Sequence, residues 1–271
     1  MTAFIFPAPD ARFGLYLADL TGHPFFYLSL IAIFGACLGS FANAAAMRLV
    51  RDESPVSPPS RCRFCDRPLK WYQNIPLLGW LAVRGKSACC DSKLPLRYIA
   101  AELGFALICC QLFLFLPITH ALVMSFVALI GLIALMTDSE ALILHPPSLL
   151  AGMIAGLLAA LIIPSWPLSW LEAASGLFVG AALVIIVNEV YQSIRGRYGF
   201  GSGDIWLLGM IGAVLGPIAA IIIFFSASIL GALVGIALIL SGKAIITSKL
   251  PFGLFLSVVF LLYPALNMLF I

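Results

Sequence analysis

The sequence predicts an all-α membrane protein with about eight transmembrane helices and a small cytoplasmic, cysteine-containing insertion. Composition is the first observation behind this prediction. Of the 271 residues, 62% are hydrophobic and only 10% are charged, whereas about a quarter of the residues of a soluble domain are charged. The second observation is that the apolar residues form runs long enough to cross a bilayer. We expect these runs to be helices, because a lone strand in lipid leaves its backbone groups unpaired.

The apolar runs are separated by short polar or turn-forming stretches. They lie near residues 25–47, 100–117, 121–137, 148–164, 173–192, 205–216, 218–242 and 252–270. The sixth and seventh runs form one uncharged stretch of 38 residues. As a single helix this stretch would reach roughly 57 Å, well beyond a bilayer core of about 30 Å. We therefore expect a hairpin at Gly216-Pro217, since glycine followed by proline is a turn signal.

The basic residues indicate how the helices are oriented. Ten of the fifteen Lys and Arg residues lie between Arg48 and Arg97, and positively charged loops favour the cytoplasmic side. The loops that then share this side are 138–147, 193–204 and 243–251. Of the fifteen basic residues, only Arg12 lies outside these cytoplasmic segments. The expected location is the bacterial inner membrane, with both termini in the periplasm and a periplasmic turn at 164–170 whose tryptophans lie at the interface.

This topology divides the chain into three parts. Residues 1–47 form the periplasmic N-terminus and the first transmembrane helix, residues 48–99 form a basic cytoplasmic segment, and residues 100–271 form the other helices. We find no internal repeat in the sequence. Four of the seven cysteines lie in the basic segment, and these four are candidates for a shared role.

The four cysteines of the basic segment form two pairs. Cys62 and Cys65 make a CxxC motif, and Cys89 and Cys90 follow it. Four thiols at this separation in a cytoplasmic segment predict a structural zinc site. Adjacent cysteines strain a tetrahedral site, and Asp91 is a weaker candidate for the fourth ligand. The alternative is a small basic domain with reduced, unliganded thiols, because disulfides are disfavoured in the cytoplasm.

Two acidic residues lie at the ends of apolar runs that the topology brings to the same cytoplasmic face. Asp138 ends the third run, and Asp204 begins the sixth run after a glycine-rich stretch. An ionisable group in a membrane segment is costly and marks a candidate functional site. The glycines permit close approach of the backbone to a ligand. Helix capping alone is the alternative role for Asp204.

Two facing carboxylates can hydrolyse a peptide bond without a metal or a covalent intermediate. Like charges at short distance cannot both form cheaply, so the pair holds one proton. The ionised partner takes a proton from water, while the protonated partner polarises the scissile carbonyl. Which aspartate takes which role is left open. Other hydrolytic chemistries lack their residues, since the chain has three histidines and no HExxH motif, and we interpret His145 as loop structure.

Five short motifs follow one another along the chain. They are Gly39-Ser40-Phe41-Ala42-Asn43, Trp71-Tyr72-Gln73-Asn74-Ile75-Pro76-Leu77-Leu78-Gly79-Trp80-Leu81, Arg97-Tyr98, Gly201-Ser202-Gly203-Asp204 and Pro251-Phe252-Gly253. In residue type and order they resemble the type IV prepilin peptidases, GxGD-type aspartyl membrane proteases that are also called prepilin leader peptidase/N-methyltransferases. The resemblance covers nearly the whole chain from about residue 35.

The resemblance implies an endopeptidase that cleaves the leader of prepilins or pseudopilins at the cytoplasmic membrane face. Asp138 and Asp204 match the two catalytic aspartates of the family, and hydrolysis needs no cofactor. Many members then methylate the new N-terminus with S-adenosylmethionine, an activity expected in residues 48–99. The expected partners are the substrate helices and membrane lipid. No nucleic-acid partner is expected, and the oligomeric state is left open.

The chain departs from the family pattern at three places. Family spacing puts cysteines at positions 87 and 90, where this chain has Ser87 and Cys90, with Cys89 as the substitute. Trp206 stands where members often carry lysine. Leu144-His145-Pro146-Pro147 stands where they tend to have Leu-Pro-Asp. None of these changes removes a catalytic carboxylate.

Two other functions remain open from the sequence. A cation- or proton-coupled transporter explains the charges inside apolar segments, but it does not explain the cysteines or the GxGD turn. A catalytically silent scaffold of a pilus or secretion apparatus is the other alternative, and the substitutions at Trp206 and His145 favour it. Cleavage of a leader in detergent, where no gradient exists, separates both from a peptidase.

Overall fold

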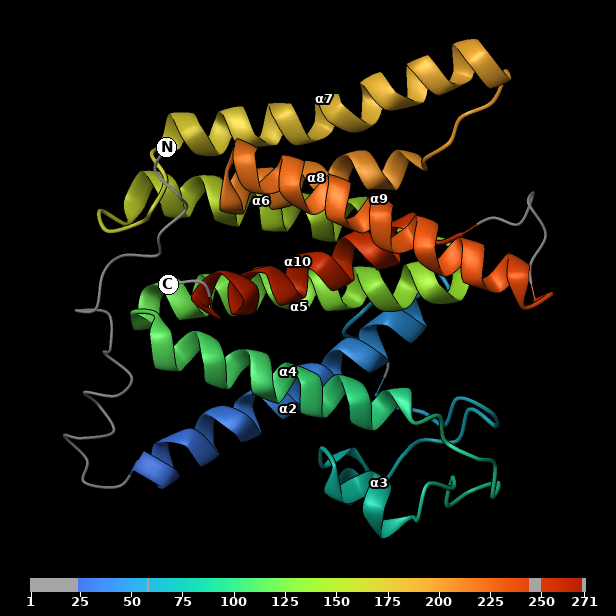
Figure 1. The fold of residues 1–271 in the computed structure, drawn as a ribbon. Coiled ribbons are helices and arrows are strands. Elements are labelled where there is room, and N and C mark those ends of the chain that lie inside the picture. The colour runs from blue at the N-terminus through green and yellow to red at the C-terminus, as the bar shows by residue number, and fades with distance from the viewer. Residues whose placement is uncertain (1–23, 58, 244–249, 270–271) are drawn as a thin grey trace. The chain divides into compact units, whose positions relative to one another are not determined.

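The computed structural model describes residues 24–57, 59–243 and 250–269, with side chains in the last range up to Pro264. These residues fall into two compact units, 24–125 and 126–269. The regular elements that they form are all helices, and two isolated β-bridges are the only strand-like pairings among them (Figure 1). The predictions made for Arg12 and for most of the loop 243–251 concern residues outside the described ranges.

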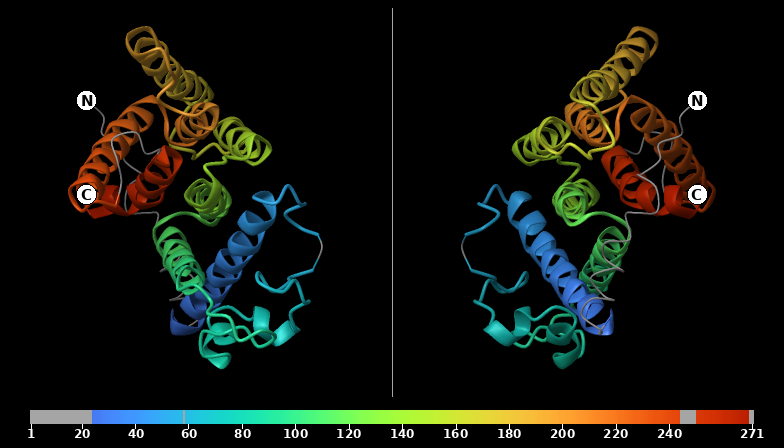
Figure 2. Two further views of the ribbon diagram at one scale, coloured as in Figure 1. Left: turned by 90° about the vertical axis from the view of Figure 1, so that its right-hand side faces the viewer. Right: turned by 90° about the vertical axis from the view of Figure 1, so that its left-hand side faces the viewer.

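The first unit contains α2, two short helices, α4 and the first turns of α5. Their bounds are Pro24–Leu49 for α2, Trp71–Asn74 for the 3-10 helix η2, Leu78–Ala82 for α3, Arg97–Phe115 for α4 and Ile118–Ala141 for α5. Helix α2 packs along α4 (Figure 2). At the contact, a Cβ on Gly39 would lie only 2.7 Å from the carbonyl oxygen of Ala101. A small residue at this position therefore sets how closely the two helices approach.

The second unit surrounds a short central helix. It contains the rest of α5 and α6 (Pro146–Ile162), α7 (Trp170–Arg195), α8 (Ser202–Leu215), α9 (Pro217–Leu240) and α10 (Phe252–Leu269). Helix α8 contacts α6, α7, α9 and α10, and every residue from Leu207 to Leu215 is buried. A helix that is apolar on all sides belongs in an interior. This burial explains why α8 can be short and still be held firmly.

The predicted hairpin lies where the sequence placed it. Helix α8 ends at Leu215, and α9 begins with Pro217 in its first turn. Gly216 between them has a φ of 86°, a left-handed conformation that a residue without a Cβ adopts freely. Proline suits the first helical turn, because its missing N–H has no partner there in any helix. The uncharged stretch is therefore two helices.

Five of the described helices are long and apolar enough to cross a membrane: α2, α4, α5, α7 and α9. Helices α6, α8 and the described part of α10 are apolar but shorter. The prediction of an all-α membrane protein is confirmed, and helices occupy the positions of the eight predicted apolar runs. The count of eight spans and the cytoplasmic insertion remain predictions.

The turn before α7 contains the two tryptophans that were predicted to lie at the membrane interface. Ser169 and Glu172 form a reciprocal capping box that starts α7, an arrangement that satisfies free N–H groups at a helix start. Trp170 is exposed and Trp166 is buried within the protein. The interfacial position of both remains a prediction.

Candidate active site

Asp138 lies in the last turn of α5 and is held by the start of α10. Its Oδ2 accepts hydrogen bonds from the backbone N–H groups of Leu254, at 2.7 Å, and of Gly253. These N–H groups have no partner within α10, and the start of a helix favours a negative charge. The carboxylate is 5% exposed. The local fold thus fixes the Asp138 carboxylate at the start of α10.

Asp204 is the third residue of α8. Its Oδ2 accepts a hydrogen bond from the N–H of Gly201 at 2.9 Å, so Asp204 does cap its helix. Its Oδ1, however, is buried and is without a hydrogen-bond partner among the described residues. A buried polar atom left unpaired costs free energy. Capping alone therefore does not account for Asp204, and Oδ1 is free to bind a proton, a water molecule or a substrate.

The structure brings together the two aspartates that the sequence singled out. Their carboxylates are close enough to interact electrostatically, although they are far apart in the sequence. Leu144 packs against two glycines near them: a Cβ on Gly203 would lie 2.6 Å from Leu144 Cβ, and a Cβ on Gly253 would lie 2.9 Å from Leu144 Cδ1. These two glycines therefore leave the space that Leu144 occupies, and Gly253 also leaves the space for Asp138 Oδ2.

Asn188 on α7 holds the glycine-rich loop that leads to Asp204. Its Oδ1 accepts from the N–H groups of Phe200, at 2.8 Å, and Gly199, at 3.1 Å, and its Nδ2 donates to the carbonyl oxygen of Phe200. The side chain is buried. Sequence reasoning missed this residue. The available signal was a single amide inside an apolar run, where a polar group needs partners.

A cluster of three aromatic rings joins the loop to the start of α10. The ring of Phe200 lies 4.4 Å from that of Phe252 and 5.8 Å from that of Phe224, centroid to centroid. Contacts of this kind add to the free energy gained by burying the rings. Phe252 directly precedes the N–H groups that bind Asp138. The supports of the two aspartates are thus packed against each other.

Replacing Asn188 with alanine is expected to lower both stability and cleavage activity. The change removes the partner of three part-buried backbone groups of the loop, and even a fully buried group left unpaired costs only about 1–3 kcal/mol. Thermal unfolding in detergent should shift down by several degrees, and kcat should fall more than KM rises, because the loop positions Asp204. Asn188→Asp keeps the acceptor oxygen and should be intermediate. Unchanged unfolding and kinetics in Asn188→Ala would show that the loop is held by other contacts.

Two departures from the family pattern have clear positions in the structure. His145 caps α6, where its Nδ1 accepts from the N–H of Ser148 at 3.3 Å. This contact confirms the interpretation of His145 as loop structure. Trp206 is 40% exposed, in contrast to the nine buried residues that follow it on α8. A substitution at position 206 therefore leaves the packed face of α8 unchanged.

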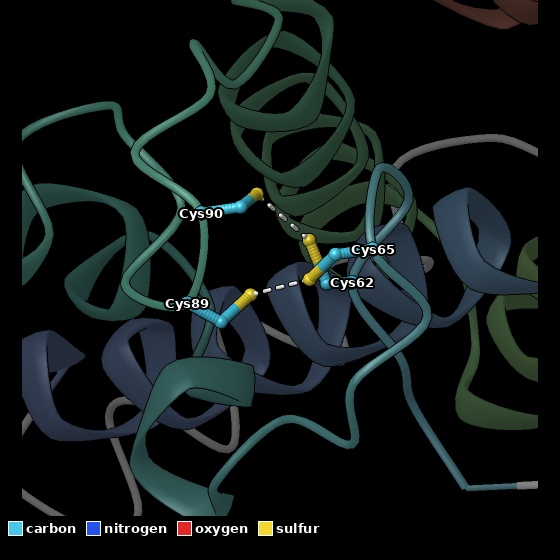
Figure 3. A group of neighbouring side chains, drawn as sticks. All are labelled: Cys62, Cys65, Cys89 and Cys90. Carbon is cyan, nitrogen blue, oxygen red and sulfur yellow. Dashed lines mark hydrogen bonds between the residues drawn. The ribbon is translucent and has the colours of Figure 1, made fainter.

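The four cysteines of the basic segment converge on one point (Figure 3). Their sulfur atoms all lie within 4.8 Å of one another, with 3.7 Å between Cys62 and Cys90 and 3.1 Å between Cys65 and Cys89. Four thiolates around zinc, with Zn–S bonds of about 2.3 Å, need sulfur separations of about 3.8 Å. The Cys62–Cys90 distance matches this separation, and the cluster fits one tetrahedral zinc ion once the sulfurs of Cys65 and Cys89 move apart by about 0.7 Å.

The environment of Cys62 favours a thiolate, the form that binds metals. Burial raises the pKa of Cys62, but hydrogen bonds from the hydroxyl of Ser87 and from the N–H groups of Phe64 and Cys65 outweigh burial and lower the pKa to about 6. A thiol with this pKa is largely ionised at neutral pH. The polar groups around Cys62 thus suit a ligand of a cation.

A cavity of about 640 Å³ lies in the first unit, between α2, the basic segment and the start of α4. Its lining includes Met47, Tyr98, Glu102 and Trp80. Glu102 is buried and accepts the N–H of Leu77 at 2.7 Å. The indole Nε1 of Trp80 is buried and has no hydrogen-bond partner in the described part of the chain. The lining also contains the acidic residues Glu53 and Asp66 and the arginines Arg48, Arg51, Arg61 and Arg63. Apolar side chains, charged groups of both signs and an unpaired donor fit a ligand such as S-adenosylmethionine, which combines an aromatic base with a sulfonium cation, an ammonium group and a carboxylate.

Two family models match the chain. Residues 33–116 match the bacterial peptidase A24 N-terminal domain, and residues 124–236 match the type IV leader peptidase family. A prepilin leader peptidase/N-methyltransferase of Bacillus subtilis (strain 168) is 33% identical over 83% of this chain and 89% of its own length. The chain belongs to the type IV leader peptidase family. The resemblance seen in the sequence motifs is thereby confirmed.

Other members of the type IV leader peptidase family give similar matches. The protein of the same name from Myxococcus xanthus (strain DK1622) is 34% identical over 82% of this chain and 67% of its own length. That from Aeromonas hydrophila is 29% identical over 90% of this chain and 92% of its own length. No solved structure gives a significant match. The matched ranges 33–116 and 124–236 fall largely in the first and the second unit, so both units have counterparts in the family at the level of sequence.

Proposed function

We propose that this family member is a membrane aspartyl endopeptidase that removes the leader of type IV prepilins or pseudopilins, with Asp138 and Asp204 as its catalytic residues. The observation that carries the assignment is the buried pair of carboxylates, each held by backbone N–H groups at a helix start. The unpaired Oδ1 of Asp204 adds to it. The relatives reported above are named prepilin leader peptidase/N-methyltransferase.

The reaction uses the single proton that the pair holds. The ionised carboxylate takes a proton from a water molecule, which attacks the scissile carbonyl carbon, while the protonated carboxylate donates to the carbonyl oxygen. The leaving amine then receives a proton from the pair. The N–H groups of Gly253 and Leu254 stabilise Asp138 whenever it is ionised. Both aspartates share the roles of base and acid.

The pair lies at the cytoplasmic face of the bacterial inner membrane in this proposal. Asp138 is at the end of α5, while Asp204 and Gly253 are at the starts of α8 and α10. An antiparallel course of the helices puts all three at the same end. Arg195 and Arg197, which directly precede the Asp204 loop, favour the cytoplasm for that end. The proposed topology has eight spans and periplasmic termini, with domains at 1–47, 48–99 and 100–271.

The basic segment carries two further proposed roles. Cys62, Cys65, Cys89 and Cys90 hold a structural zinc ion, which stabilises a segment that has little regular structure. The cavity lined by Glu102 and Trp80 binds S-adenosylmethionine. When bound, this cosubstrate supplies the methyl group for the new N-terminal amine. The carboxylate of Glu102 would face the sulfonium cation, and the indole N–H of Trp80 would donate to a polar atom of the ligand.

One incubation tests cleavage and methylation separately. The purified chain in detergent, with no ion gradient, is mixed with a prepilin and S-adenosylmethionine, and the products are weighed by mass spectrometry. Loss of the leader mass supports the peptidase, and a further gain of one methyl group supports the transferase. An uncleaved prepilin under these conditions would favour the transporter or the scaffold.

Replacing Glu102 with glutamine is expected to reduce methylation and spare cleavage. Glutamine can still accept the N–H of Leu77, but it has no charge to face a sulfonium cation. Because two opposite charges about 4 Å apart near a protein surface attract each other by about 1–4 kcal/mol, methylation should fall about tenfold or more. The measurement is the ratio of methylated to unmethylated product. A parallel loss of cleavage, or an unchanged ratio, would argue against this use of the cavity.

A further inference from the structure

The two halves of the cysteine segment have the same backbone structure, displaced by 25 residues. In the first half, the backbone N–H groups of Cys62, Asp66 and Leu69 donate to the carbonyl oxygens of Arg67, Cys62 and Ser60, at 2.8, 3.0 and 2.8 Å respectively. In the second half, those of Ser87, Asp91 and Leu94 donate to Ser92, Ser87 and Gly85, all at 2.8 Å. Each bond of the first half has its counterpart in the second. In the sequence this repeat is short, since only Cys65, Asp66 and Leu69 have identical counterparts, in Cys90, Asp91 and Leu94, and it was missed there.

Two other features repeat with the same displacement. Asp66 and Asp91 both have a positive φ, of 53° and 54°, which is uncommon for residues other than glycine. A β-bridge joins Arg61 to Pro68 in the first half, and another joins Lys86 to Lys93 in the second. The segment is therefore a pair of equivalent metal-binding turns, here called the first and second knuckle, at residues 60–69 and 85–94.

The equivalence assigns each cysteine a position in its knuckle. Cys65 corresponds to Cys90, and Cys62 corresponds to Ser87. Cys89 corresponds to Phe64, a position that carries no thiol in the first knuckle. Two identical knuckles would have cysteines at positions 62, 65, 87 and 90. The second knuckle instead has the hydroxyl of Ser87 at its first ligand position, and its additional thiol, Cys89, is two residues further along the chain.

The side chains nevertheless gather four sulfur atoms. Cys89 Sγ lies 3.1 Å from Cys65 Sγ and belongs to the group within 4.8 Å. Ser87 is buried, and its Oγ lies 3.1 Å from Cys62 Sγ and 3.1 Å from Cys89 Sγ. A serine hydroxyl keeps its proton at neutral pH and has one hydrogen to donate, whereas zinc prefers sulfur and nitrogen donors.

We propose that Cys89 supplies the fourth thiolate of the zinc site from outside the knuckle register, and that the Ser87 hydroxyl donates a hydrogen bond to the thiolates instead of binding the metal. This proposal rests on the zinc site proposed above. It makes Ser87 a positioning residue, because groups that hydrogen-bond to ligands orient them and adjust how tightly the metal is held. In the proposed site, three ligands occupy equivalent positions of the two knuckles, and the fourth, Cys89, does not.

The test uses the full-length protein in detergent and measures metal binding. Zinc is counted by mass spectrometry, its affinity is measured by competition with a chelator, and cobalt is substituted for zinc so that thiolate-to-cobalt absorption reports the number of sulfur ligands. The variants are Cys89→Ser, Ser87→Ala, and Ser87→Cys combined with Cys89→Ser. Cys110→Ser, in the apolar part of α4, is the matched control.

The expected results separate the roles of the two residues. The wild type binds one zinc with four thiolates, and Cys89→Ser loses the metal or one thiolate absorption. Ser87→Ala keeps four thiolates but binds zinc about 10–100-fold more weakly. The double variant regains tight binding, because its thiol is in register; this rescue also shows that the fold tolerates the change at position 89.

Three results would overturn the proposal: a wild type without zinc, a Cys89→Ser variant with wild-type metal affinity, or a double variant that stays metal-free. Leader cleavage is measured on the same samples. Cleavage by a zinc-free wild type would overturn the metal site and leave the peptidase assignment intact. Zinc binding without cleavage would overturn the peptidase assignment and leave the metal site intact.

Discussion

Replacing Asp138 or Asp204 with asparagine is expected to reduce leader cleavage by about 10³-fold, because an amide can neither take a proton from water nor return it. The loss should appear in kcat, with little change in KM, since the substitution keeps the size and most hydrogen-bonding capacity of the side chain. Combining both changes should add little to either one, as for groups that act as a unit. Initial rates on a purified prepilin in detergent measure all three variants.

Glu189→Gln is the matched control for these variants. Glu189 is a carboxylate on α7, next to Asn188 in sequence, but it is exposed. Its replacement should leave the cleavage rate at the wild-type value. Each variant should also unfold at a temperature close to that of the wild type. Near-normal rates in Asp138→Asn or in Asp204→Asn would remove the paired-aspartate mechanism.

Gly253→Ala is the second change with a large expected effect. A Cβ at this position would lie 3.0 Å from Asp138 Oδ2 and 2.9 Å from Leu144 Cδ1, so its neighbours must shift by a few tenths of an ångström. The end of the Leu144 side chain can move away, but a shift of the hydrogen-bonded Asp138 carboxylate moves a catalytic group. Because a misplacement of 1 Å costs about 100-fold in rate, we expect a loss of up to this size. The measurement is kcat for leader cleavage.

Gly104→Ala provides the same chemical change where there is room for it. Gly104 is in α4, and an added Cβ would meet no atom within 4 Å. Alanine is the better helix former, so this variant should keep full activity. Trimming the neighbour in Gly253→Ala/Leu144→Ala should restore part of the rate. Full activity in Gly253→Ala alone would mean that the carboxylate can move without loss of function.

Local rules predicted most of the fold. Apolar runs, the Gly216-Pro217 turn and the distribution of Arg and Lys were sufficient to place the helices, because each depends on neighbours in the sequence. The burial of α8 was not predictable in this way. A short apolar helix can lie at a surface or in an interior, and only contacts with α6, α7, α9 and α10 decide.

The sequence predicted the candidate aspartates but not their supports. An acidic residue at the end of an apolar run can be recognised from the sequence alone. The N–H groups of Gly253 and Leu254 are not, because any residue supplies such a group, and neither is the space that Leu144 requires. Asn188 and the repeated knuckle were missed for a similar reason, since the bonds that reveal them involve backbone atoms whose partners are set by the fold.

Chemical cross-linking of positions 138 and 204 tests the central claim most directly. Cys37, Cys109 and Cys110, which lie outside the four-cysteine cluster, are first replaced by serine. Asp138→Cys/Asp204→Cys is then treated with a short bifunctional thiol reagent, and Asp138→Cys/Glu189→Cys serves as the comparison. We predict a linked peptide in the first pair and none in the second. A folded protein in which 138 links to 189, or in which 138 and 204 never link, would contradict a catalytic pair.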